Sequence, residues 1–159
     1  MKKIIFYALL GALSLNFISC EEEDGDGNGN ESNDVVISPV ENLYTGTINV
    51  EFRGQTNATE GVDCGVLKDD NKKTIDLNLY QVKFVPQMPL TIDLTIPSIS
   101  FQESNNEIKF SADSIAPTMG GNPYPDYAAK KLTGIITGDS IWFQCTFGDY
   151  PTTYQGNLK

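Results

Sequence analysis

Apolar and polar residues alternate along most of this chain, from Val35 to the C-terminus, and no stretch there carries a helical period of useful length. The clearest alternation spans residues 44–53 (YTGTINVEFR), where every second residue from Tyr44 to Phe52 falls on one face. A period of two predicts a β-strand with one buried face. Seven further segments follow the same pattern, at residues 62–66, 75–84, 90–96, 108–110, 132–137, 140–147 and 153–159.

Short polar turns join most of these segments. Examples are Asp69-Asp70-Asn71, Ser104-Asn105-Asn106 and the two-residue turn Gly138-Asp139. Turns of this length connect antiparallel neighbours, and closing a sheet removes the edges that otherwise pair and aggregate. The pattern predicts an all-β domain over residues 41–159, an eight-stranded antiparallel meander β-barrel. A two-sheet sandwich is the alternative, but its Greek-key crossovers need longer connections.

The first twenty residues differ from everything after them. Two lysines precede an almost continuously apolar run from Ile4 to Ile18, which is shorter than the ~20 residues of a membrane-spanning helix and typical of a signal peptide. The run ends in Phe17-Ile18-Ser19-Cys20, which resembles a bacterial lipobox. We expect residues 1–19 to be a lipoprotein signal peptide and Cys20 to be the lipidated mature N-terminus. A plain secretory signal with an incidental cysteine is the alternative.

The next segment, residues 20–40, is acidic and rich in Gly and Asn. Seven of the 21 acidic residues lie between Glu21 and Asp34, and such a composition predicts a flexible tether. An acidic cluster directly after a lipidated cysteine also resembles the surface-export signal of lipoproteins in the Bacteroides group. We therefore expect a lipid-anchored protein of the outer membrane that faces the cell exterior.

Composition argues against several classes of function. The chain has no His, so Ser-His-Asp and Cys-His catalysis and His-based zinc sites are excluded. Its pI near 4.3 argues against binding to nucleic acid, which requires a basic surface. Asp76 and Asp93 occupy outward positions of their strands and form no acid–base pair. We expect a protein that is not an enzyme and that holds no cofactor or metal.

Two cysteines, Cys64 and Cys145, remain once Cys20 is lipidated. Both share the parity of the apolar face, and an exported compartment permits a disulfide. Such a bond would close a loop of about 80 residues and stabilise by roughly 4 kcal/mol. The two strands are not neighbours in a meander, however, so the alternative is two separate buried thiols.

Aromatic residues suggest where the domain contacts other molecules. The longest irregular stretch, Pro117 to Ala129, carries Tyr124 and Tyr127, and long loops at barrel mouths often carry function. The tyrosines either contact a ligand or pack on the barrel rim. Trp142 has the parity opposite to Ile141 and Phe143, so it is either an outer contact residue or part of a second layer.

Two short motifs fit the D-[ST]-apolar pattern of O-glycosylation in the Bacteroides group. They are Asp113-Ser114-Ile115 and Asp139-Ser140-Ile141. Ser114 and Ser140 are accordingly candidate glycosylation sites.

The strand sequences carry a family resemblance. The segments concerned are Gly46-Thr47-Ile48, Asp76-Leu77-Asn78-Leu79 with Phe84, Met88-Pro89 before Ile92-Asp93-Leu94-Thr95-Ile96, and residues 132–141 (LTGIITGDSI). Over residues 44–159 the chain resembles the calycin-like β-barrel lipoproteins of Bacteroidales, which are similar in shape to lipocalins. The resemblance implies an eight-stranded barrel and, by analogy, the capture of a small molecule inside it.

Two functions follow from these observations. In the first, the barrel of a surface lipoprotein binds a small apolar or glycan-derived ligand without catalysis. In the second, the barrel is filled and serves as a scaffold or binds a protein partner, because large residues such as Phe110, Phe143 and Phe147 have inward parity. An interior void smaller than roughly 300 Å³ would argue against the first function.

Overall fold

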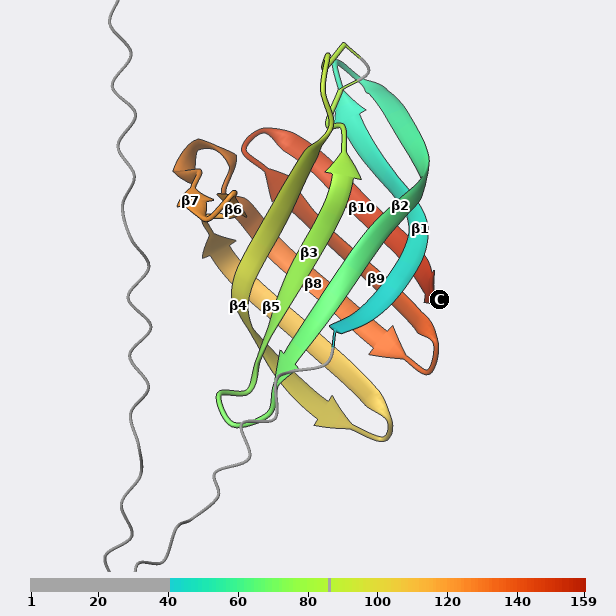
Figure 1. The fold of residues 1–159 in the computed structure, drawn as a ribbon, viewed down its shortest axis with the longest axis vertical. Coiled ribbons are helices and arrows are strands. Elements are labelled where there is room, and N and C mark those ends of the chain that lie inside the picture. The colour runs from blue at the N-terminus through green and yellow to red at the C-terminus, as the bar shows by residue number, and fades with distance from the viewer. Residues whose placement is uncertain (1–40, 86) are drawn as a thin grey trace, which may run out of the picture. The chain divides into compact units, whose positions relative to one another are not determined.

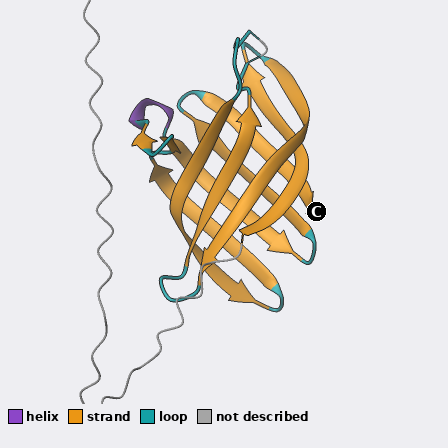
Figure 2. Ribbon diagram, in the orientation of Figure 1, coloured by secondary structure: helices purple, strands orange, loops and turns teal. Residues whose placement is uncertain are grey.

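The computed structural model describes residues 41–85 and 87–159, and this part of the chain consists almost entirely of β-strands (Figures 1 and 2). The long strands are β1 (Glu41–Phe52), β2 (Gln55–Asp69), β3 (Thr74–Val82), β4 (Ile92–Ser104), β5 (Glu107–Ile115), β8 (Ala129–Thr137), β9 (Ser140–Phe147) and β10 (Tyr150–Leu158). Two short strands, β6 (Thr118–Met119) and β7 (Asn122–Pro123), and the 3-10 helix η1 (Pro125–Tyr127) lie between β5 and β8. The expected signal peptide, the tether and Cys20 fall outside the described residues.

The eight long strands form a closed antiparallel barrel. Their order is β3-β2-β1-β10-β9-β8-β5-β4, and the pairing of β3 with β4 closes the ring. Consecutive long strands are neighbours throughout, and β1 pairs with the last strand, β10. The predicted meander barrel is therefore confirmed, and the sandwich alternative is wrong.

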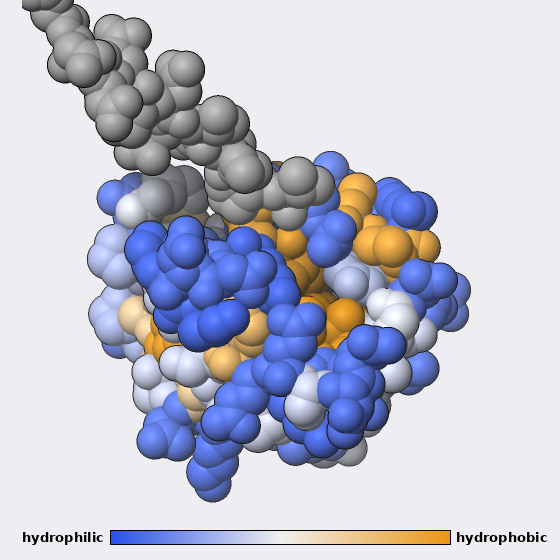
Figure 3. All heavy atoms as spheres, turned by 90° about the horizontal axis from the view of Figure 1, so that it is seen from below, coloured by the Kyte–Doolittle hydropathy of each residue, from blue (hydrophilic) through white to orange (hydrophobic). Residues whose placement is uncertain are grey.

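The two ends of the barrel are built differently. At the upper end in Figure 1 lie the β1–β2, β3–β4 and β9–β10 turns together with the long β5–β8 connection. At the lower end lie the start of β1, the C-terminus and the remaining turns. Figure 3 views this lower end, where apolar residues are visible inside a rim of hydrophilic ones. None of the described residues forms a helix with the length and apolar character needed to cross a membrane.

Bulges in β3 and β4 shift the alternation that the sequence predicts. Ile96 and Ile99 are both fully buried although they lie three residues apart, because the register with β3 shifts between them. Ser98, in the bulge, has a φ of 56°, and its backbone N–H donates to Asp76 Oδ1 at 2.6 Å. Gln81, with a φ of 53°, donates in the same way to Asp93 Oδ1 at 2.8 Å. The two outward carboxylates thus satisfy backbone donors that the bulges release from the ladder.

Large side chains fill the interior of the barrel. The fully buried ones include Tyr154, Phe143, Phe147, Ile48, Ile75, Leu77, Leu79, Ile96, Ile99, Leu132 and Ile141. The rings of Phe143 and Tyr154 stack with centroids 5.2 Å apart, and Phe110 lies 6.4 Å from Phe143. Gly134 faces inward beside Phe110, where a Cβ atom would overlap the Phe110 ring. The lumen is therefore a packed core, as expected for a small eight-stranded barrel.

Candidate functional site at the barrel mouth

An apolar cavity lies at the upper end of the barrel, above the packed core. Its volume is about 360 Å³, which falls within the range of small-molecule sites. We call it the mouth pocket. It is lined by nine residues, namely Phe84, Val85, Met88, Ile92, Leu94, Met119, Tyr124, Tyr127 and Tyr150.

Three separate parts of the chain build this pocket. The connection between β3 and β4 and the start of β4 supply one wall, the β5–β8 connection supplies a second, and Tyr150 at the start of β10 supplies the third. The floor is continuous with the core, since the rings of Phe84 and Phe147 meet edge to face at 5.0 Å and Leu94 is buried. A molecule in the pocket would therefore rest on core side chains, outside the lumen.

Backbone hydrogen bonds hold the β5–β8 connection in place. Tyr124 N donates to Pro117 O at 2.8 Å, and Tyr127 N donates to Tyr124 O at 3.2 Å. Gly148, in the β9–β10 turn, donates from its N–H to Ala128 O at 3.1 Å. The connection that carries the two tyrosines is therefore fixed by hydrogen bonds within itself and by one hydrogen bond to the β9–β10 turn.

Met88 makes two hydrogen bonds within the β3–β4 connection. Met88 N donates to Val85 O at 3.1 Å, and Met88 Sδ accepts from Phe84 N at 3.3 Å. This folds the connection back so that Met88 faces the pocket. Methionine is flexible and polarizable, and it adapts to irregular apolar shapes.

The chemistry of the pocket is neutral. None of its nine lining residues is charged, and the hydroxyl groups of the three tyrosines are its only side-chain hydrogen-bond donors. Tyr124 is 39% exposed and Tyr127 is 43% exposed, so both rings border the pocket and also reach solvent. The arrangement can bury an apolar body and offer it a few hydrogen bonds at the rim. It contains no nucleophile, acid–base pair or cation.

The structure divides the predicted contact residues between two places. Tyr124 and Tyr127 come together at the mouth pocket. Trp142 lies on the outer face of β9, 37% exposed, and does not line that pocket. Trp142 is therefore a residue of the outer face and not part of a second layer.

Other lining residues were not apparent from the sequence. Met88, Met119 and Tyr150 lie in three different connections or strand starts, and only the barrel closure brings them together. A weak signal is available for Met88, because it sits between two prolines in the break that separates two strands. Met119 and Tyr150 carry no comparable signal.

Cys64 and Cys145 are both buried and unbonded. They lie on β2 and β9, which β1 and β10 separate in the sheet. Burial raises the pKa of the Cys145 thiol to about 12 and raises the pKa of the Cys64 thiol further. Of the two alternatives, the structure has two separate thiols, and both are held in the protonated, weakly reactive form.

The candidate glycosylation sites lie on the surface. Ser114 is exposed on β5, and Ser140 is exposed at the start of β9, where its Oγ donates to Asn157 Oδ1 at 2.9 Å. Their modification stays a prediction. Among residues 41–85 and 87–159, no group of three or more Cys, Asp or Glu side chains is placed to hold a metal ion.

Comparisons of the chain with protein-family models, curated proteins and solved structures found no match. The barrel is consistent with a calycin-like shape.

Proposed function

We propose that this protein is a lipid-anchored lipoprotein of the outer membrane that binds a small apolar molecule in the mouth pocket. The observation that carries the proposal is the pocket itself, an uncharged cavity of about 360 Å³ with three tyrosines and two methionines among its lining residues. A neutral ligand suits it, because a charged group would be desolvated there without a partner. The binding is non-catalytic.

The position of the pocket supports display at a membrane. β1 begins at Glu41, at the lower end of the barrel (Figure 1), so the chain that precedes it joins the barrel at the end opposite to the mouth. In the proposed lipoprotein, Cys20 carries the lipid at the membrane, and the domain formed by residues 41–159 faces the cell exterior. Two or more acyl chains at Cys20 would make this anchoring stable.

Binding is tested with a neutral fluorescent probe, N-phenyl-1-naphthylamine, titrated into the full chain carrying Cys20→Ser so that no lipid competes. We expect saturable fluorescence that the double variant Tyr124→Ala/Tyr127→Ala weakens at least tenfold. The matched control is Trp142→Ala, which removes a similarly exposed aromatic ring from outside the pocket and should bind the probe normally. Absence of binding, or equal binding by the double variant, would contradict the proposal. Native mass spectrometry of the purified protein would then identify any co-purified molecule.

Location is tested separately. Protease treatment of intact cells should degrade the protein, and Cys20→Ser should release it from the membrane fraction. Complete protection from protease would contradict exposure on the cell surface.

The packed lumen favours a second candidate function, a scaffold or protein-binding module. Phe143, Phe147 and Tyr154 occupy the space in which a hollow barrel would hold a ligand. Leu90, 73% exposed beside the mouth, offers a contact for a protein partner. Failure of the probe to bind, together with loss of a cross-linked partner in Leu90→Ser, would favour this function over the first.

A further inference from the structure

Six uncharged polar side chains form a line across the outer face of the barrel. They come from six neighbouring strands, and each is directly opposite the next in the strand register. In order they are Ser100 (β4), Ser111 (β5), Thr133 (β8), Gln144 (β9), Thr153 (β10) and Asn49 (β1). Directly paired residues of antiparallel strands point to the same face, so these residues make one continuous set. We call it the polar row.

The polar row is uncharged throughout. Every member carries a hydroxyl or an amide, and four of the six are exposed while Thr153 and Asn49 are half-buried. Measured along the curved surface of the barrel, five inter-strand spacings give the row a length of about 24 Å. It therefore presents hydrogen-bonding groups at regular intervals over a distance much longer than a single small molecule.

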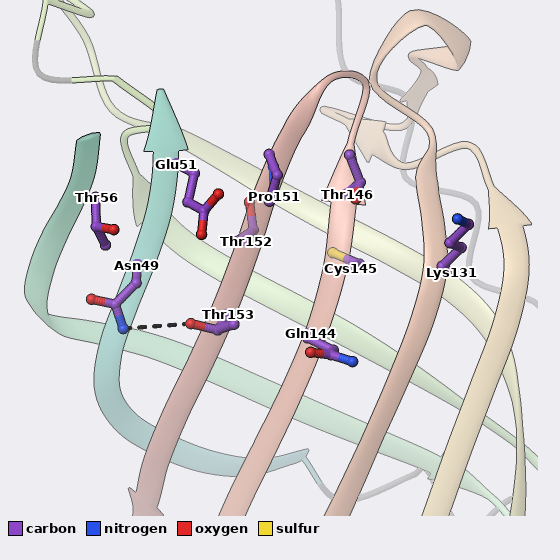
Figure 4. A pocket seen from close by; sticks show the side chains of 10 residues that line it. All are labelled: Asn49, Glu51, Thr56, Lys131, Gln144, Cys145, Thr146, Pro151, Thr152 and Thr153. Carbon is purple, nitrogen blue, oxygen red and sulfur yellow. Dashed lines mark hydrogen bonds between the residues drawn. The ribbon is translucent and has the colours of Figure 1, made fainter. Parts of the chain in front are cut away.

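Most of these groups are unused by the fold. Among the described residues, the one side-chain hydrogen bond within the row joins Asn49 Nδ2 to Thr153 Oγ1 at 3.5 Å (Figure 4). This is longer than the usual range for such a bond. The donors and acceptors of the row therefore remain available to a bound molecule.

Two shallow depressions follow the row from end to end. One, of about 520 Å³, is lined by Asn49, Thr153 and Gln144 together with other residues of β1, β2, β8, β9 and β10 (Figure 4). The other, also of about 520 Å³, is lined by Ser100, Ser111 and Thr133. Thr133, which lines the second depression, is paired with Gln144, which lines the first, so the two depressions follow one another along the row.

An aromatic ring lies beside the centre of the row. Trp142 is two residues from Gln144 on β9 and pairs with Ile135 on β8. Trp142 and Ile135 both line the second depression. Trp142 is partly exposed, while Phe143, the next residue, is fully buried in the core. A flat aromatic surface with a polar edge suits a ligand that has apolar C–H faces and hydroxyl groups at its rim.

The charges near the row leave it close to neutral. Lys109, which lines the second depression, has its ammonium group 3.2 Å from a Glu107 carboxylate oxygen. Glu51 and Lys131 contribute opposite charges to the first depression. A strongly charged ligand therefore finds no matching field. An extended peptide is also disfavoured here, because each of the six strands that carry the row is paired with a neighbour on both sides and so offers no free edge along the row.

We propose that this outer wall binds an extended, neutral polysaccharide chain. Its sugar hydroxyl groups exchange hydrogen bonds with the polar row, and one sugar ring stacks on Trp142. The site is separate from the mouth pocket, and the proposal does not depend on a ligand being bound there.

Trp142 is the only tryptophan of the chain, so its fluorescence reports directly on this site. The probes are soluble amylose, mixed-linkage β-glucan, xylan and galactomannan, titrated into the full chain carrying Cys20→Ser. We expect at least one to shift and quench the tryptophan emission and to retard the protein in affinity gels. Alginate, an anionic polysaccharide, should do neither, and the response should be insensitive to salt.

Variants locate the binding. Trp142→Ala and Gln144→Ala should each weaken retardation at least tenfold, and Trp142→Phe should retain most of it, which separates stacking from a folding defect. The control is Tyr124→Ala/Tyr127→Ala, which alters the mouth pocket and should bind polysaccharide normally. The proposal is overturned if none of the four neutral polysaccharides binds. It is also overturned if binding is unchanged in Trp142→Ala and Gln144→Ala, or is lost only in the tyrosine double variant.

Discussion

Two walls of the same barrel use their outer polar residues in opposite ways. On the wall around β2 and β3, which we call the tied wall, Asn78 Nδ2 and Tyr80 Oη both donate to Glu41 Oε1, at 2.9 Å and 2.7 Å. Thr95 Oγ1 then donates to Asn78 Oδ1 at 2.8 Å. The surface that carries the polar row runs around the six other strands, and we call it the open wall. Its hydroxyl and amide groups have one long hydrogen bond among them.

Charge follows the same division. On the tied wall, Asp63 accepts from Thr45 Oγ1 at 2.6 Å and from Lys159 Nζ at 2.8 Å, and the hydrogen bond to Glu41 raises the pKa of Tyr80 to about 12. The row on the open wall has no ionisable member. The difference teaches that an outward polar residue belongs to the fold when its neighbours satisfy it, and is free for binding when they do not.

The largest expected effect is on the free energy of unfolding, when a core residue behind the open wall is replaced. Phe143→Ala should lower the free energy of unfolding by about 3–5 kcal/mol, because it leaves a cavity between Phe110 and Tyr154. Its neighbour Trp142→Ala, on the outer face, should cost less than about 1 kcal/mol. Urea denaturation of the two variants measures the difference. Equal losses would mean that Trp142 supports the fold and would weaken its assignment as a contact residue.

A smaller effect should separate the outer residues of the two walls. Asp76→Ala removes the acceptor of the Ser98 N–H in the β4 bulge. Because Ser98 is exposed and water can replace this acceptor, we expect a loss of about 0.5–1.5 kcal/mol. Gln102 lies on the outer face of β4 and lines the second depression of the open wall. Gln102→Ala should change stability by less than about 0.5 kcal/mol. Thermal unfolding followed by circular dichroism compares them. A cost for Gln102→Ala as large as that for Asp76→Ala would contradict the distinction between the walls.

The smallest effect is a pH dependence confined to the tied wall. Hydrogen bonds from Lys159 and Thr45 hold the pKa of the Asp63 carboxyl below its ordinary value. A carboxyl whose folded pKa is lowered contributes stability above the unfolded pKa of about 4 and loses it as the pH falls through the folded pKa.

Replacing Asp63 with Asn should therefore flatten the decline in stability between neutral pH and about pH 3, by less than about 1 kcal/mol because the pair is partly exposed. Denaturation midpoints at several pH values measure this slope. An unchanged slope in Asp63→Asn would show that the pair contributes nothing to acid stability.

The strands were predictable because their signal is local. A residue such as Ile48 or Val50 reveals its buried face through its neighbours two positions away, and the Gly138-Asp139 turn marks its own position. The bulges at Gln81 and Ser98 were not predictable in this way. They depend on how β3 and β4 align across the barrel closure, and this alignment is also what gives Asp76 and Asp93 their backbone partners.

The candidate sites were predictable only in part. The long connection with Tyr124 and Tyr127 was visible as a break in the alternation, and the outward parity of Trp142 could be counted along β9. The residues that lie beside Tyr124, Tyr127 and Trp142 in the folded barrel could not be predicted. Met88 and Tyr150 are distant from the tyrosines in sequence, and the polar row takes one residue from each of six strands.

By itself, the sequence determined the all-β class, the number of long strands and the face on which most side chains lie, because alternation and turn chemistry act over a few residues. Only the tertiary structure decided that the lumen is packed, that an apolar pocket remains at the mouth, and which outer polar groups are paired. Those properties depend on strand register and ring closure, which bring together residues that no local pattern connects.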